Sequence, residues 1–190
     1  NPKEPVDGPY YCKKHSRTCY PVSEAMKFIK RYSFDTIDRI KDFMDLRGNG
    51  KVKIINEDVR EFKLDTKVDG VITSPPYVGN IDYHEQHRYS YELLDLKRYD
   101  KLEIGPKYKG KNKSARQEYK EKMIEAMKNI AKYVKPKGKI VIVANDRYDM
   151  YEDIFSASNL ELKHVLNRDV NRRTGRRGNG YSEAIFIVEK

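Results

Sequence analysis

The fold and the chemistry of this chain are approached from one segment, Val68-Asp69-Gly70-Val71-Ile72-Thr73-Ser74-Pro75-Pro76-Tyr77. Its apolar, β-branched residues, followed at once by two prolines, predict a buried strand that ends in a rigid loop. Pro75 and Pro76 have a fixed φ angle and no backbone N–H, so their carbonyl oxygens are held in place as acceptors without a local donor. The Ser74 hydroxyl precedes them and the Tyr77 ring follows. Acceptors beside a flat aromatic face suit the exocyclic amino group of a nucleobase.

The tetrapeptide Ser74-Pro75-Pro76-Tyr77 after a hydrophobic strand resembles motif IV of the DNA amino-methyltransferases, in which [Ser/Asn/Asp]-Pro-Pro-[Tyr/Phe] is the catalytic signature. The serine form resembles mostly the cytosine-N4 branch, and adenine-N6 members share the pattern. The resemblance implies S-adenosylmethionine as the cofactor and methyl donor, and a base flipped out of the duplex as the acceptor. It also implies that these four residues are the catalytic site. The alternative is a plain structural Pro-Pro turn.

The acidic end of an expected strand supplies a candidate cofactor contact. Residues 51–55 alternate and predict a strand that ends at Asn56-Glu57-Asp58. In open α/β sheets, ligands bind at the carboxyl ends of the strands. The resemblance places an acid at this position near the adenine of the cofactor, and we therefore predict cofactor contacts at Asp58, Thr73 and Ser74. The alternative for Asp58 is a solvated loop acid.

Composition and charge indicate a polyanionic partner. Of the 190 residues 36% are charged, the formal net charge is +10, and the pI is about 9.4. A highly charged thermophile surface would explain the density of charge, but it explains the positive sign less well than a polyanionic partner does. The sequence has no apolar run long enough for a membrane span and no signal-peptide core. We therefore expect a cytoplasmic protein, with DNA as its partner and no membrane association.

Candidate nucleic-acid contacts occur in three places. The segment after Tyr77 interleaves aromatic and polar residues, residues 97–122 are strongly basic, and residues 171–180 combine arginines with glycines on an expected hairpin. A helix and solvated charged surfaces are the alternatives. The predicted contacts are Tyr83, His84, His87, Lys109, Lys111, Lys113, Arg172, Arg173, Arg176 and Arg177.

The hydrophobic periodicity predicts an α/β fold. We expect an N-terminal segment of loop and helix over residues 1–50 and a catalytic methyltransferase domain over 51–190. The second segment resembles the Rossmann-like methyltransferase three-layer sandwich. That fold has a mostly parallel sheet and ends in a C-terminal antiparallel hairpin, so that the last strand runs against the others. Strands are expected at 51–55, 68–72, 140–143, 160–166 and 184–188, and helices at 23–46 (with a break near 33–35), 119–134 and 149–158.

One hallmark of the family has no match in this sequence. Its Phe-x-Gly-x-Gly cofactor loop is absent, and Gly48-Asn49-Gly50 is interpreted as a turn because no strand precedes it. We therefore expect a partial domain. The missing strands could precede Asn1, follow Lys190 in a permuted arrangement, or belong to a partner chain. An upstream origin is favoured because the helix at 23–46 fits one that lies before the third strand of the fold.

Cys12, His15 and Cys19 form a Cys-x2-His-x3-Cys pattern in a segment, residues 1–22, that is otherwise expected to be loop. A zinc ion, a disulfide and two thiols are the alternatives. Structural zinc sites usually have four ligands, so no metal is predicted.

The main functional prediction is a site-specific DNA (cytosine-N4) methyltransferase of a restriction-modification system. An RNA base amino-methyltransferase and a non-catalytic nucleic-acid-binding subunit are the alternatives. The absence of the cofactor loop would explain the second of these. Methyl transfer by a protein with a complete cofactor site would separate the enzyme from the binding subunit.

Overall fold

A computed structural model describes residues 8–13, 16–20, 25–170 and 181–190. Contacts divide the chain into two compact units, unit 1 (Asn1–Ile54) and unit 2 (Ile55–Lys190). No helix among the described residues is both long enough and apolar enough to cross a bilayer. Each unit is described by itself.

Unit 1 begins with a short antiparallel hairpin of β1 (Tyr10–Cys12) and β2 (Arg17–Cys19). The prediction that residues 1–22 are loop throughout is therefore wrong for these two strands, whose tyrosines and threonine favour extended backbone. Cys12 is buried. His15, the middle residue of the Cys-x2-His-x3-Cys pattern, lies outside the described residues.

The second part of unit 1 is one continuous helix, α1 (Ala25–Leu46). The break predicted near 33–35 is wrong, because the segment contains neither Gly nor Pro and its polar residues bond along the helix. Asp35 accepts a hydrogen bond from Arg39 at 3.0 Å, and the Thr36 hydroxyl donates to the Tyr32 carbonyl at 2.7 Å. The apolar residues of the helix are exposed within the described structure.

The strand predicted at 51–55 does not form, and this prediction is wrong. Val52 and Ile54 are exposed, Ile54 at 89%. An alternating segment becomes a strand only when a neighbouring strand satisfies its backbone, and none pairs with it among the described residues. Consequently Asp58 follows an irregular segment and not the end of a strand.

Unit 2 contains a four-stranded sheet with the order β3-β4-β6-β5. Its strands are β3 (Val68–Thr73), β4 (Val134–Ala144), β5 (Glu161–Val170) and β6 (Tyr181–Glu189). β3 pairs with β4 in parallel, and β6 is antiparallel to both of its neighbours. Three of the four strands therefore run in one direction, with the last strand inserted against them. This confirms the predicted mostly parallel sheet with a C-terminal antiparallel hairpin.

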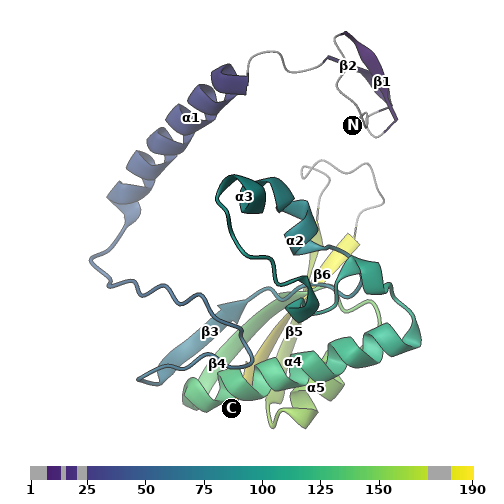
Figure 1. The fold of residues 1–190 in the computed structure, drawn as a ribbon. Coiled ribbons are helices and arrows are strands. Elements are labelled where there is room, and N and C mark those ends of the chain that lie inside the picture. The colour runs from purple at the N-terminus through teal and green to yellow at the C-terminus, as the bar shows by residue number, and fades with distance from the viewer. Residues whose placement is uncertain (1–7, 14–15, 21–24, 171–180) are drawn as a thin grey trace. The chain divides into compact units, whose positions relative to one another are not determined.

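The core lies between the sheet and two helices on one of its faces, α4 (Lys113–Tyr133) and α5 (Tyr151–Ala157) (Figure 1). α4 begins earlier than the predicted 119 because the Asn112 side chain caps it, accepting from the Ala115 N–H at 2.8 Å. The buried residues of this core include Met123, Met127, Ile130, Ile140, Ile142, Ile154, Phe155, Phe186 and Val188.

The other face of the sheet is open in the described part of unit 2. Pairing places Ile72, Val141 and Ile187 in one row across the sheet and Val143 beside Ile185 in the next. These side chains alternate with those of the core face. Ile72 is 84% exposed and the other four are only half-buried. We call these five residues the open face.

The connection from β3 to α4 carries four short elements. They are the helices α2 (Tyr83–Gln86) and α3 (Arg88–Leu93) and the 3-10 turns η1 (Asp100–Leu102) and η2 (Lys107–Lys109).

Candidate active site

The Ser-Pro-Pro-Tyr segment begins where β3 ends, beside the end of the parallel strand β4. The Ser74 hydroxyl donates a hydrogen bond to the Val143 carbonyl at 3.0 Å. A serine hydroxyl has one donor hydrogen and two acceptor lone pairs. Because its hydrogen points to Val143, the exposed oxygen of Ser74 can receive a hydrogen bond from a ligand.

The second proline is held by two buried tyrosines. The Tyr119 hydroxyl of α4 lies 2.9 Å from the Pro76 carbonyl oxygen and 2.8 Å from the Tyr151 hydroxyl of α5. The carbonyl can only accept, so Tyr119 donates to it and Tyr151 donates to Tyr119. Burial raises the pKa of Tyr119 to about 12 and that of Tyr151 well above its usual value, which keeps both groups protonated. Among the described residues the Pro75 carbonyl has no such partner.

The ring of Tyr77 packs partly against the core, and its hydroxyl donates to Glu183 Oε1 at 2.6 Å. Glu183 lies on β6 and also accepts from Arg168 of β5, with its Oε2 at 3.0 and 2.6 Å from two guanidinium nitrogens. Burial opposes the charge of Glu183, but the hydrogen bonds from Tyr77 and Arg168 outweigh it, so the pKa of Glu183 is below its usual value. The carboxylate is therefore ionised at neutral pH.

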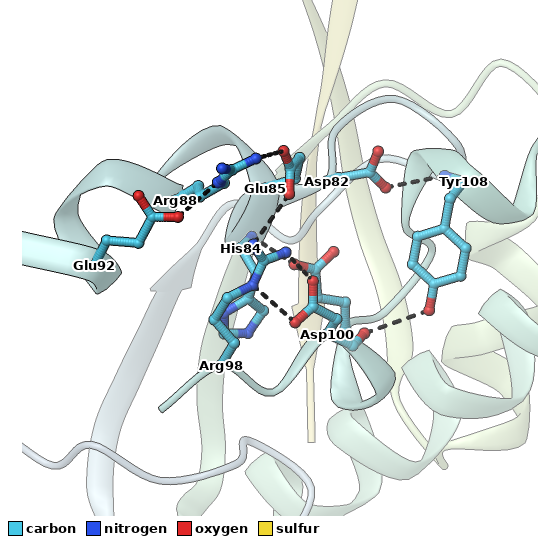
Figure 2. Close-up of polar contacts among 9 residues, drawn as sticks. Asp82, His84, Glu85, Arg88, Glu92, Arg98, Asp100 and Tyr108 are labelled. Atoms are coloured by element: carbon cyan, nitrogen blue, oxygen red, sulfur yellow. Dashed lines mark hydrogen bonds and ion pairs between the residues drawn. The ribbon is translucent and has the colours of Figure 1, made fainter. Parts of the chain in front are cut away.

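The loop after the motif is tied to the segment before α4. The Gly79 N–H donates to the Gly105 carbonyl at 2.8 Å, and the Lys107 N–H donates to the Ile81 carbonyl at 3.2 Å. The Asp82 carboxylate accepts from the Tyr108 N–H at 2.9 Å (Figure 2). These bonds fix the backbone of the loop that follows the motif against the segment that precedes α4.

Charged side chains join the helical part of this loop. Arg98 pairs with Asp100 and, at 3.0 Å, with Glu85, while Arg88 bonds Glu92 at 2.7 Å (Figure 2). The pKa of Arg98 is raised, mainly by its hydrogen bond to Asp100. Arg98 thus links α2 to η1, whereas the Arg88–Glu92 bond lies within α3.

Gly79 allows a test of how closely this loop must pack. Its φ is +62°, and a Cβ there would lie 2.4 Å from the Gly110 carbonyl oxygen and 2.5 Å from Lys111 Cγ. Gly110 has a φ of +74°, yet a Cβ on it would meet nothing within 4 Å. We expect Gly110→Ala to lower the free energy of unfolding by about 1–3 kcal/mol through backbone strain alone, and Gly79→Ala to lower it by more.

Urea unfolding of both variants, compared with the wild type, checks this expectation. Equal losses in the two variants would show that the loop moves apart without cost and that the packing at Gly79 is not tight.

The predicted nucleic-acid residues of the loop have different environments. Tyr83 and His87 are exposed. His84 is half-buried. Its backbone N–H donates to Glu103 Oε1 at 2.7 Å, and the centroid of its ring lies 4.9 Å from that of Tyr91. His84 is thus also part of the internal packing of the loop. Its predicted contact with nucleic acid stays a prediction.

The predicted basic contacts are also divided. Lys109 forms an ion pair with Glu118, which also binds Lys122, whereas Lys111 and Lys113 are exposed at the start of α4. The arginines of the expected hairpin loop, Arg172, Arg173, Arg176 and Arg177, lie outside the described residues. In the part of the chain that the structure describes, no group of three His, Cys, Asp or Glu side chains is arranged to hold a metal ion.

Asp58 does not lie at the end of a strand, because the strand expected before it does not form. Its carboxylate accepts hydrogen bonds from the guanidinium and, at 2.9 Å, from the backbone N–H of Arg60. The hydrogen bond from the Arg60 side chain is the main reason that the pKa of Asp58 is below its usual value. The Asp58 carboxylate is therefore engaged in a local ion pair, and its contact with a cofactor stays a prediction. Thr73 is the last residue of β3, adjacent to Ser74.

Sequence reasoning missed four residues that hold the motif: Tyr119, Tyr151, Arg168 and Glu183. Tyr119 is the first residue of the helix predicted at 119–134, but its hydroxyl was given no partner. Glu183 is an acid directly before a run of strand-forming apolar residues, and such a misplaced charge was the one signal available for it.

A parallel strand that ends in Ser-Pro-Pro-Tyr, in a sheet whose last strand is inserted antiparallel, is compatible with a partial Rossmann-like methyltransferase domain. Over 98% of its length the chain is 43% identical to the Type II methyltransferase M.MjaII of Methanocaldococcus jannaschii, in an alignment of 202 residues. The chain spans 38% of the length of that relative. No protein-family model matches the chain.

Proposed function

We propose that this chain is the catalytic part of a site-specific DNA methyltransferase that modifies an exocyclic amino group, namely N4 of cytosine. The similarity to a Type II methyltransferase supports DNA methylation as the activity. The serine of the tetrapeptide supports the cytosine-N4 branch, because the family resemblance associates serine with that branch. A net charge of +10 suits a DNA substrate.

The single observation that carries the proposal is the orientation of Ser74. Its hydroxyl hydrogen is given to the Val143 carbonyl at 3.0 Å, which leaves lone pairs on an exposed oxygen. Ser74 and the Pro75 carbonyl can then accept the two hydrogens of a base amino group. Accepting both hydrogens localises the nitrogen lone pair and makes the nitrogen a better nucleophile. S-adenosylmethionine, when bound, supplies an electrophilic methyl group on a sulfonium.

Tyr77 is the residue that receives the flipped base in this proposal. Extrusion of a base from the duplex costs a few kcal/mol, and stacking on an aromatic side chain returns about 1–3 kcal/mol. The Tyr77 ring follows Pro76 directly, so the stacking face and the two acceptors lie on one short segment of backbone. The exposed Lys111 and Lys113 are proposed to contact phosphates nearby.

The residues of this chain fit the base better than the cofactor. A bound nucleotide cofactor needs a glycine-rich turn after a strand, where the backbone can approach it closely, and the sequence has no such turn. Asp58 is held by Arg60. We propose that further sequence, in a longer chain or in a partner chain, supplies the glycine-rich loop. The open face of the sheet and the 38% coverage of the relative support this proposal.

The test is the identity of the methylated base. The chain, together with the sequence that carries the glycine-rich loop, is incubated with unmethylated DNA and labelled S-adenosylmethionine. The DNA is then digested to nucleosides for mass spectrometry. We expect N4-methylcytosine. N6-methyladenine would contradict the choice of cytosine, and 5-methylcytosine or no label in DNA would contradict amino-group transfer. Labelling of RNA but not DNA would assign the substrate to RNA.

A further inference from the structure

We propose that Glu183 is a positioning residue for the methyl-transfer reaction, and that it acts by fixing the ring of Tyr77 in the orientation that stacks on the flipped base. The inference rests on the proposed function, and it adds a residue that lies 106 positions away from Tyr77 in the sequence.

The first argument is the strength of the contact. The Tyr77 hydroxyl lies 2.6 Å from Glu183 Oε1, in the range of hydrogen bonds from a hydroxyl to a charged carboxylate. Such bonds are about twice as strong as neutral ones. A tyrosine ring turns about two side-chain bonds, and a bond to its far end removes that freedom. The ring is therefore fixed at the hydroxyl end as well as at its backbone.

The second argument is the position of the carboxylate. Glu183 is only 6% exposed, and a buried charge is unfavourable unless it is paired and hydrogen-bonded. Arg168 supplies the pairing on Oε2 and Tyr77 supplies the donor on Oε1. An aliphatic residue would fill this site on β6 without the desolvation of a charge. The ionised glutamate is stabilised here by two partners, and one of them is the Tyr77 hydroxyl.

The third argument is that the other end of Tyr77 is also held. The residue before it, Pro76, is fixed through its carbonyl by Tyr119 of α4, at 2.9 Å. Tyr77 is thus held at two ends. Its backbone follows a proline that α4 holds, and its hydroxyl is bound by Glu183 of β6. The stacking surface is positioned before the base arrives, which lowers the entropy lost on binding.

The experiment compares four variants of the methylating protein: Tyr77→Phe, Glu183→Leu, the double variant of these two, and Glu183→Gln. Rates of methyl transfer and the KM for duplex DNA are measured separately. We expect the two single variants each to lower kcat about tenfold, the loss of one hydrogen bond to a charged group, with an unchanged KM. The double variant should be no slower than the slower single variant, because both changes remove the same contact.

Two controls distinguish positioning from folding. Glu183→Gln keeps an oxygen acceptor for the Tyr77 hydroxyl and should recover part of the rate, because its neutral acceptor forms a weaker bond. Glu189→Leu removes an acid from the same strand without touching the motif, and should retain the wild-type rate. Tyr77→Phe serves if Glu183→Leu does not fold, because Tyr77→Phe leaves the Glu183–Arg168 pair intact. Wild-type kcat in Tyr77→Phe, or additive losses in the double variant, would overturn the role of Glu183. A wild-type protein that binds DNA but transfers no methyl group would overturn the proposed function as well.

Discussion

Replacement of Ser74 by alanine is expected to lower the rate of methyl transfer by about 10²-fold, the loss seen when one preorganised polar group is removed from a catalytic site. The Ser74 oxygen is directed outward because its hydrogen is given to the Val143 carbonyl. In the proposed mechanism, alanine removes this acceptor and leaves the Pro75 carbonyl as the remaining partner of the amino group. The contact is exposed, so the free energy of unfolding should fall by about 1 kcal/mol or less.

The measurement is single-turnover transfer of labelled methyl groups to DNA by the protein that carries the complete cofactor site. Ser114→Ala, an exposed serine in the first turn of α4, is the matched control and should retain the wild-type rate. Ser74→Asn restores a side-chain oxygen acceptor that the family signature also uses, and should recover part of the loss. An unchanged rate in Ser74→Ala would show that Ser74 does not accept a hydrogen bond from the amino group.

The second large effect concerns the cofactor. We expect residues 1–190 by themselves to bind S-adenosylmethionine at least about 100-fold more weakly than the protein that includes the glycine-rich loop, which corresponds to about 2.7 kcal/mol of binding free energy. In the proposed function the Ser74 loop faces the methyl group that is transferred, and the Asp58 carboxylate is already hydrogen-bonded to Arg60. The sequence has no Phe-x-Gly-x-Gly loop, the type of glycine-rich turn at which a backbone can approach a nucleotide cofactor closely.

Isothermal titration of the chain with S-adenosylmethionine, with and without the added sequence, checks this expectation. The demethylated product S-adenosylhomocysteine is a suitable second ligand, because it lacks the transferred methyl group and should show the same dependence on the added sequence. Saturable micromolar binding by residues 1–190 alone would mean that the chain contains a complete cofactor site.

Elements with strong local signals were predicted well from the sequence. The β-branched run before Pro75, the apolar run of β4 and the two C-terminal strands each carry a pattern that needs no knowledge of distant residues. Helix α5 was also found, and α4 was missed only in its first turns, where the cap at Asn112 extends it. The strand predicted at 51–55 was wrong because an alternating pattern permits a strand, whereas pairing with a neighbouring strand stabilises it.

The chemical groups of the candidate site were determined by the sequence by itself, because Ser74, Pro75, Pro76 and Tyr77 are adjacent and their donors, acceptors and rings follow from residue type alone. Only the tertiary structure decided how those groups are oriented. The Val143 carbonyl directs the Ser74 oxygen, Tyr119 holds Pro76, and Glu183 holds Tyr77. Their partners lie 69, 43 and 106 positions away in the chain. No local pattern records such contacts, because a side-chain hydrogen bond depends on which strands and helices become neighbours when the sheet is assembled.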